Sequence, residues 1–311
     1  MALTDRKLLR TYPIVLAGTS FAVMENIQPN EGLRQIEHRA AGELGPVDFA
    51  IAHHEPSVQF QTPDLGKLLT LDSAILTEGV ALTGNTDIQW RAEKNAGGLE
   101  AVTASSNVRA RSPEAFLQVD SFRVSTNDPQ PVMATCTLFL LKNSGGTPPS
   151  VVTASTALTA RAAFSDSWQL GELVVDSTKW GGLMSIEYTS GINSEPRYEK
   201  GLQQPFGRRI TDRKPMFRAM LKNEDILTTH GFGEVKFNSS ETVDIYCRHI
   251  DEDNGGRTPE TGVGNEKHFK VSLTEPVLFV NQPGDDGMVP VDIYHREGKT
   301  VTAVSNAEFP A

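Results

Sequence analysis

Hydrophobic and polar residues alternate along most of this chain with a period of two residues. Such alternation is typical of β-strands that bury one face, and β-branched and aromatic residues are frequent in the same runs. Turns rich in Gly, Pro, Asn and Asp separate the runs. The pattern therefore predicts a mainly β protein. The runs cover residues 35–39, 57–61, 116–124 and 134–140 in the first half, and 184–189, 216–221, 243–248, 269–280 and 289–294 in the second.

One helical segment interrupts the strands in each half. Residues 62–70 begin with Thr62 as an N-cap, followed by Pro63 and Asp64 in the first turn. The segment 222–228 offers Asn223 as a cap, followed by two acidic residues. We therefore expect each half to be a β-sandwich or rolled sheet that carries one short α-helix.

Short motifs recur in the same order in both halves. Their offsets range from 150 (182 − 32) to 159 (210 − 51), which loop insertions explain. We interpret the chain as a tandem duplication of two homologous domains, residues 1–147 and 148–311. The anchors of this alignment are Ile36 and Glu37 with Ile186 and Glu187, Ile51 and Pro56 with Ile210 and Pro215, Asp87 and Arg91 with Asp244 and Arg248, and residues 133–139 with 288–294.

The two copies are expected to differ in one loop. The rise in offset from 150 to 159 assigns 9 (159 − 150) extra residues to the second copy, within residues 190–209. A long loop on one copy of a repeated domain often contacts neighbouring subunits, although a solvated insertion is an equally good interpretation. The candidate contact residues are Pro196, Arg197, Tyr198, Phe206, Arg208 and Arg209.

Composition and charge narrow the classes of function. Of the 311 residues, 38% are hydrophobic and 22% charged, which is typical of soluble globular domains. No apolar run has the length of a membrane span, and Pro13 interrupts the short apolar stretch near the N-terminus, so we expect neither a membrane segment nor a secretory signal. The net charge of −10 argues against a protein that binds nucleic acid by neutralising phosphates.

No arrangement typical of a catalytic or metal site is apparent. His53-His54-Glu55 is the one local cluster of acid–base groups, but adjacent histidines on a strand point to opposite faces, so a surface position is favoured. The segment 251–256 lacks the spacing of a calcium loop and is interpreted as an acidic turn. Cys136 and Cys247 are expected to be thiols of the core. We predict no enzymatic activity, no metal and no cofactor.

The organisation of the chain resembles the tail tube proteins of long-tailed bacteriophages. The resemblance rests on the paired G-L-x-x-I-E strands at residues 32–37 and 182–187, the helices after Pro56 and Pro215, and the loop 190–209. It implies stacked rings, trimeric with pseudo-sixfold symmetry when two tube domains are fused, that form a hollow tube. DNA would pass through a negative lumen without specific binding. Implied partners are other copies of the chain and other tail proteins, within a virion assembled in the host cytoplasm.

Three alternative functions stay open at this level. The chain could form another ring of a virion or secretion machine, such as a tail terminator, a connector or a needle tube. It could be a two-domain β-sandwich module that binds a carbohydrate or another ligand, although its five Tyr and three Trp are dispersed. It could also be an enzyme with a site at the domain junction.

Overall fold

The computed structural model describes residues 8–38, 48–94, 97–126, 131–163, 167–222, 226, 233–235, 241–250, 267–297 and 299–308, with backbone only at 35–38, 48–50 and 234–235. The protein is mainly β, as the alternating pattern predicted. The first half contains β1 (Leu9–Leu16), β2 (Thr19–Ser20), β3 (Glu25–Asn30), β4 (Leu33–His38), β5 (Asp48–His54), β6 (Ser57–Thr62), α1 (Leu65–Leu71), α2 (Ile75–Glu78), β7 (Val80–Ala92), β8 (Asn107–Ser125), β9 (Met133–Leu141) and β10 (Val151–Thr156).

The second half continues with strands, and all of its elements follow residue 167. They are β11 (Trp168–Val175), β12 (Thr178–Trp180), β13 (Leu183–Thr189), β14 (Asn193–Arg197), β15 (Gly207–Asp212), β16 (Met216–Leu221), β17 (Gly233–Val235), β18 (Thr242–His249), β19 (His268–Thr274), β20 (Val277–Val280), β21 (Val289–Tyr294) and β22 (Val301–Ala307).

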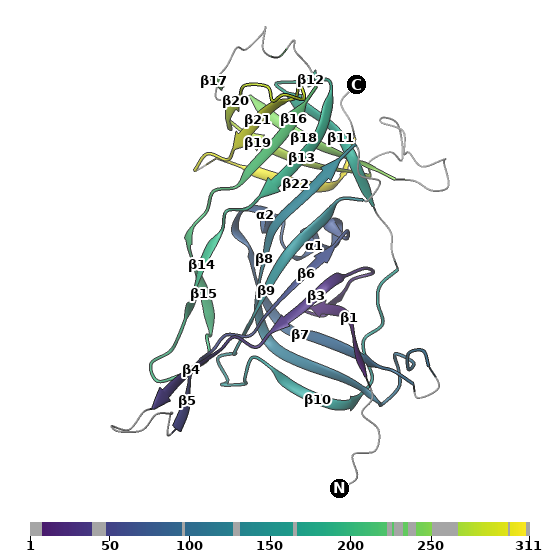
Figure 1. Cartoon of the computed structure of the whole chain (residues 1–311), viewed down its shortest axis with the longest axis vertical. Coiled ribbons are helices and arrows are strands. Elements are labelled where there is room, and N and C mark those ends of the chain that lie inside the picture. The colour runs from purple at the N-terminus through teal and green to yellow at the C-terminus, as the bar shows by residue number, and fades with distance from the viewer. Residues whose placement is uncertain are drawn as a thin grey trace.

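One antiparallel sheet crosses both halves of the molecule (Figure 1). Its strands follow the order β3, β6, β9, β8, β13, β16, β21, β20 and β17, and we call it the long sheet. The long strand β8 makes the connection, because its last residues pair with β13 of the second half, with Phe122 opposite Tyr188. The rings of these two residues stack at 4.9 Å between centroids. The junction between the halves is therefore both hydrogen-bonded and packed with aromatic side chains.

A second layer of strands covers one face of the long sheet. In the first half this layer contains β1, β7, the beginning of β8, and β10. In the second half it is a separate sheet with the order β12, β11, β18, β19 and β22. The hydrophobic core between the layers includes Phe60, Phe122, Trp168 and Phe217, each at most 1% exposed, in one cluster that extends through both halves. Burial of such side chains stabilises the fold by about 1.5–3 kcal/mol each.

The order of strand pairing is similar in both halves, except that β19 and β20 belong to different sheets where the first half has the one strand β8. In the first half it runs β1, β7, β8, β9, β6, β3, and in the second half β11, β18, β19, then β20, β21, β16, β13. Each series begins with a hairpin, β1–β2 or β11–β12. Its turn has two residues, and both have positive φ. Each has a separate hairpin as well, β4–β5 or β14–β15, and a last strand, β10 or β22, beside β8 or β19. These matched pairings define corresponding positions in the two halves.

Two glycines show where the sequence alignment was wrong. Gly32 and Gly191 have φ of +57° and +56°, and a Cβ atom would lie 2.0 Å from Glu55 O in one case and 2.7 Å from Lys214 O in the other. Both pairs are equally far apart in the chain (55 − 32 = 214 − 191). In conformation and in this close contact Gly32 therefore resembles Gly191, whereas the sequence alignment pairs it with Gly182. If Gly32 is aligned with Gly191, the offset is already 159 (191 − 32), and residues 190–209 would hold no extra length.

The same correction applies to the anchors after those glycines. Ile36 and Glu37 lie on β4, within a projecting hairpin, whereas Ile186 and Glu187 lie on β13, in the long sheet. Gly-Leu followed by alternating residues fits the start of any strand, so this motif matched two different strands. The anchors at Asp87 and elsewhere downstream agree with the pairing.

Two smaller expectations also change. The first half has two helices where one was expected, and α1 begins after Asp64, while Thr62 ends β6 and donates its hydroxyl to Val23 O. Strand β10, which follows the expected boundary at residue 147, pairs with β8 of the first half. Most of the second predicted helix lies outside the described residues; Ile226 is helical.

Candidate functional site

The β14–β15 hairpin, residues 193–212, runs from the second half alongside the first half (Figure 1), and we call it the arm. All six candidate contact residues lie on it. Its backbone is hydrogen-bonded to the first half, because His54 N donates to Gln203 O at 2.9 Å and Lys142 N donates to Pro205 O at 3.0 Å. The arm is therefore docked on the first half of its own chain.

Tyr198 is the central polar contact of the arm. Its hydroxyl donates a hydrogen bond to the Glu55 carboxylate, and its ring lies 4.8 Å from the His53 ring. Burial, followed by the hydrogen bond with Glu55, raises the pKa of Tyr198. The phenol therefore stays protonated and remains a donor at neutral pH.

Arg208 packs beside this contact. Its guanidinium lies 3.6 Å from the centroid of the Phe139 ring, in cation–π geometry. It also donates to Ser194 Oγ at 2.9 Å and to Ser194 O at 2.6 Å. Burial lowers the pKa of Arg208, but a guanidinium stays charged. Lys142, only 8% exposed in its side chain, pairs with Glu199 of the arm at 2.9 Å.

The other four candidate residues lie within the arm or at its surface. Arg197 lies over the Phe206 ring, with 5.4 Å to the centroid. Pro196 is opposite Arg208 on the neighbouring strand, and Arg209 is exposed. Contact of these residues with another subunit stays a prediction, while Tyr198 and Arg208 already contact their own chain.

An ion-pair bridge fixes the base of the arm. Arg213 donates to Glu78 of α2 at 2.6 Å and to Glu297, after β21, at 3.1 Å. The hydrogen bond with Glu78 contributes most to raising the pKa of Arg213. This side chain therefore connects the two halves of the chain.

The histidine cluster seen in the sequence forms part of this interface. His53, His54 and Glu55 are half-buried beneath the arm. Their contacts are the Tyr198 ring and hydroxyl, and Gln204, whose side chain lies 3.5 Å from His54 Nδ1. The surface interpretation was therefore incomplete, because these residues form the platform on which the arm rests.

The long sheet has a second feature, a polar face opposite the core. We call it the open face. Across the first half, one row of paired residues on this face is uncharged and runs from Gln28 through Gln59 and Thr137 to Gln118. The buried carboxylate of Asp120 accepts from Thr137 at 2.5 Å and from Gln118 at 2.8 Å. Burial raises the pKa of Asp120.

Across the second half the corresponding row alternates in charge. Glu187 lies between Arg123 and Arg218 on its two neighbouring strands, and Arg218 in turn lies opposite Asp292. Arg218 donates to both Asp292 oxygens, at 2.7 and 3.2 Å. Each arginine of this row therefore has a carboxylate on an adjacent strand. Sequence analysis missed the row, because cross-strand neighbours are set by register, which the single sequence left open.

The remaining duplicated anchors are structural. Asp87 is 2% exposed and accepts two hydrogen bonds from Arg111, at 2.7 and 2.8 Å. Asp244, the anchor matched to it in the sequence, has its Oδ2 atom 3.8 Å from Lys270 Nζ. Arg91 donates to Glu100 O, which holds the loop after β7. Arg248 lies on β18 opposite Gln169.

Neither reactive thiols nor a metal site appear among the described residues. Cys136 and Cys247 are both 0% exposed, and burial raises the pKa of Cys247 to about 12. Within the described ranges no group of three His, Cys, Asp or Glu residues could hold a metal ion. The acidic turn 251–256 lies outside them. The buried thiols are inert, as expected for core cysteines.

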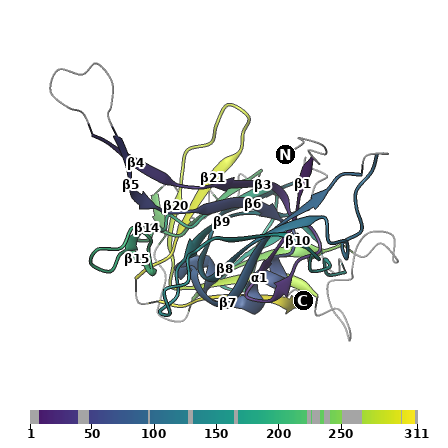
Figure 2. The same cartoon turned by 90° about the horizontal axis from the view of Figure 1, so that it is seen from below.

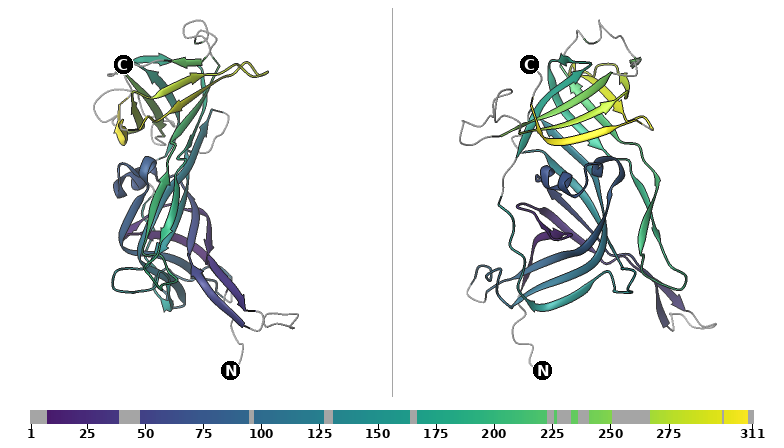
Figure 3. Two further views of the ribbon diagram at one scale, coloured as in Figure 1. Left: turned by 90° about the vertical axis from the view of Figure 1, so that its left-hand side faces the viewer. Right: turned by 180° about the vertical axis from the view of Figure 1, so that it is seen from behind.

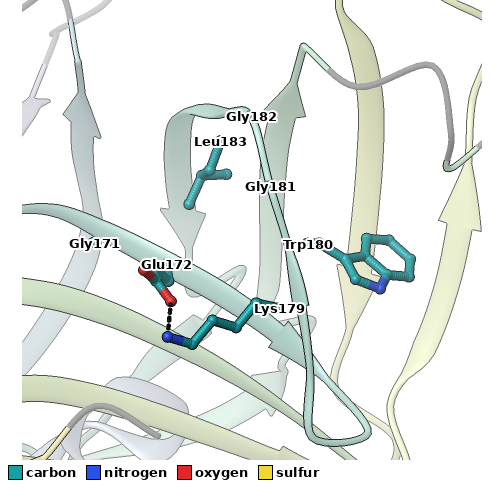
Figure 4. A pocket seen from close by; sticks show the side chains of 7 residues that line it. All are labelled: Gly171, Glu172, Lys179, Trp180, Gly181, Gly182 and Leu183. Carbon is teal, nitrogen blue, oxygen red and sulfur yellow. Dashed lines mark ion pairs between the residues drawn. The ribbon is translucent and has the colours of Figure 1, made fainter. Parts of the chain in front are cut away.

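A small pocket lies between β11, β12 and the start of β13 (Figure 4). Glu172 and Lys179 form an ion pair at 3.4 Å on its wall, while Trp180 points away from that pair. Leu183 and three glycines complete the lining. An ion pair beside apolar atoms offers no arrangement of nucleophile and base.

No protein-family model matches this chain, and the search of curated proteins found no match either. No helix of the described residues is long and apolar enough to span a membrane. Functional inference therefore rests on the strand pairing, the arm and the open face.

Proposed function

We propose that the chain is a tandem duplication and a structural subunit that assembles with copies of itself into rings of a tail tube. The common pairing order supports the duplication. The registers support it further, since Val15 opposite Asp87 is matched by Val174 opposite Asp244, with separations of 159 (174 − 15) and 157 (244 − 87). Two unrelated halves would have no reason to share these registers.

The single observation that carries the assembly proposal is the unequal pairing of two corresponding strands. In the second half, β13 pairs on one side with β16 and on the other with β8. Its counterpart β3 pairs with β6 alone among the described strands, and five of its six residues are exposed. An unpaired edge is a template for another strand. The relation of β13 to β8, repeated between chains, would bring β3 of one copy to the opposite edge of the long sheet in the next copy. There the three-residue strand β17 pairs with β20, so β3 would have to extend or replace that pairing.

If each copy is related to the next by the same rotation, the copies close into a ring in which no sheet edge stays free. Pro29 lacks an N–H group, so the pairing of β3 would rest on its other residues. Three chains with two tube domains each would give the pseudo-sixfold ring that the resemblance implies.

The arm and the β4–β5 hairpin fit the same scheme. The arm of the second half contacts the first half, and the β4–β5 hairpin of the first half projects away from the body (Figures 2 and 3). If the same relation is repeated, this hairpin would lie on the second half of a neighbouring copy. Its platform there would include Lys214 and Tyr294, the counterparts of Glu55 and Phe139.

The open face would line the lumen. Its paired rows are polar across both halves as far as Asp292, beyond which the exposed Phe279 follows on β20. In the charged row, carboxylates of Glu187 and Asp292 flank the cation of Arg218. A guanidinium already paired with a carboxylate attracts phosphates weakly, and the overall charge of −10 repels them. Such a surface would let DNA pass without holding it.

The test is self-assembly of the purified full chain. Negative-stain microscopy and sedimentation velocity over rising protein concentration should reveal rings or hollow rods of uniform width. A chain that stays strictly monomeric at all salt and protein concentrations would overturn the proposal. A tail terminator or connector would instead give single rings that never stack, and a ligand-binding module would stay monomeric.

A further inference from the structure

The outer edge of the second half is covered by a helix of the first half. A Cβ atom at Gly66 of α1 would lie 3.4 Å from Trp168 Cη2 and 3.5 Å from Ser305 of β22. Under this cover Trp168 is 1% exposed, and Ala303 of β22 is 5% exposed. Gly66 of the first half thus lies close to both β11 and β22, two strands that β18 and β19 separate in the sheet.

The same edge exists in the first half, where β1 and β10 correspond to β11 and β22. Leu9 takes the place of Trp168, since Leu9 is opposite Ala92 and Trp168 is opposite His249, the residue that corresponds to Ala92. Trp168 and Leu9 are the first residues of their strands.

The last strands correspond residue by residue as well. Val152 of β10 is opposite Ala110 of β8, and Ala303 of β22 is opposite Val271 of β19. Ala110 and Val271 match each other, because they are paired with Ile88 and Ile245 at equivalent positions of β7 and β18. Ala110 and Val271 are both buried in the core, so Val152 and Ala303 project toward the core side of their sheets.

Exposure separates the two edges sharply. Leu9 is 46% exposed and Val152 is 65% exposed, against 1% and 5% for their counterparts Trp168 and Ala303. Hydrophobic side chains exposed on an edge strand favour association. The chain therefore leaves uncovered in its first half the edge that it covers in its second half.

We propose that the exposed surface that includes Leu9 and Val152 is the docking surface for the second half of another copy of this chain. The contact between α1 and β22 is the intrachain example of this interface, and it lies next to the junction of β8 with β13. The contact of α1 with β22 and the pairing of β8 with β13 would both recur between copies. The proposal rests on the proposed ring and adds to it a second contact beside the pairing of β3.

Two neighbouring valines supply a matched test. Val151 and Val152 are adjacent on β10, so they point to opposite faces, and both are exposed in the single chain. Val151 corresponds to Thr302, which is exposed in the second half and lies outside the contact with α1. Only Val152 should be buried by another copy.

The full chain with Val152→Asp is compared with Val151→Asp and with the unchanged protein by sedimentation velocity and negative-stain microscopy. Both variants should melt like the unchanged chain in circular dichroism, since both positions are exposed. V152D should raise the concentration needed for assembly roughly tenfold or more, because a buried valine becomes a buried charge. V151D should assemble normally.

The outcomes separate this surface from the ring itself. If the unchanged chain assembles and V152D assembles equally well, the docking surface is wrong while the ring stands. Equal impairment of V151D and V152D also overturns the surface, because it would show a general effect on β10. A chain that never assembles overturns both. If V152D does not fold, the isosteric Val152→Thr takes its place, with a smaller increase expected.

Discussion

Tyr198 donates a hydrogen bond to Glu55 across the two halves of the chain. The donor lies on the arm and the acceptor lies at the end of the β4–β5 hairpin, so this one bond connects the two elements of the molecule that project from the sheets. Since burial keeps the phenol protonated and the carboxylate is its acceptor, the pair is a charge-assisted hydrogen bond.

Removal of this hydroxyl should loosen the arm. Tyr198→Phe keeps the ring against His53 but leaves the Glu55 carboxylate without its donor, at a cost of about 1–3 kcal/mol in the free energy of unfolding. Urea denaturation measures the change. Tyr294→Phe is the matched control, because the Tyr294 ring packs edge-to-face against Phe279 and no hydrogen bond of its hydroxyl is found in the described structure. Equal losses in both variants would contradict the role of the Tyr198 hydroxyl.

Stability should fall as the solution becomes alkaline. Burial raises the pKa of Cys247 to about 12, well above that of a free thiol, so the folded state holds this proton more tightly than the unfolded chain. A raised folded-state pKa gives stability that is complete below the unfolded pKa and is lost as pH rises through the folded pKa. The free energy of unfolding should therefore decrease progressively from about pH 9 upward.

Cys247→Ala separates this effect from other titrations. The variant should be less stable at pH 7, because it leaves a small cavity, but its loss of stability between pH 9 and pH 11 should be shallower. Tyr246, whose pKa burial raises to about 12, contributes in the same direction and remains in both proteins. Parallel curves for the two proteins would show that Cys247 does not titrate in this range.

The strands could be predicted from the sequence, but their partners could not. The alternating runs at residues 57–61 and 134–140 lie within β6 and β9, which pair with each other. Alternation fixes which face of a strand is buried and leaves the register open. The Gly-Leu motif was therefore matched to the wrong strand. A constant offset of 159 from Val15 through Gly32 to Ser57 was present in the sequence, but it had too few identical residues to be seen.

The candidate interface was only partly predictable. The residues of the arm were predicted as contacts because their segment was interpreted as a loop lengthened in one copy. Two of them, Tyr198 and Arg208, contact the first half of their own chain. Leu9 and Val152 gave no signal, because an exposed hydrophobic residue on a strand resembles a buried one in sequence. Only comparison with Trp168 and Ala303, after the pairing is known, identifies them.

The glycine before the β4–β5 hairpin should be irreplaceable. Gly32 has φ of +57°, and a Cβ atom would lie 2.0 Å from Glu55 O, so Gly32→Ala combines backbone strain with a clash against backbone. We expect a loss of at least about 1–3 kcal/mol in the free energy of unfolding. Gly181→Ala should be nearly neutral, because Gly181 lacks a positive φ and nothing lies within 4 Å of its Cβ position. Thermal denaturation of the two variants checks both expectations.

The charged row of the open face makes a prediction about DNA. In Glu187→Gln/Asp292→Asn, the Arg218 guanidinium loses the carboxylates on both neighbouring strands, and Arg123 loses the one opposite it. These cations should then attract phosphates, so the double variant should bind duplex DNA in fluorescence anisotropy at low salt, where the unchanged chain binds weakly or not at all. Binding should weaken as salt rises. Asp285→Asn/Asp286→Asn removes the same charge from an exposed turn outside the row, so it should leave binding unchanged. If both double variants bind DNA equally, net charge alone governs the interaction, and the alternation of charges along the row has no role in keeping DNA free.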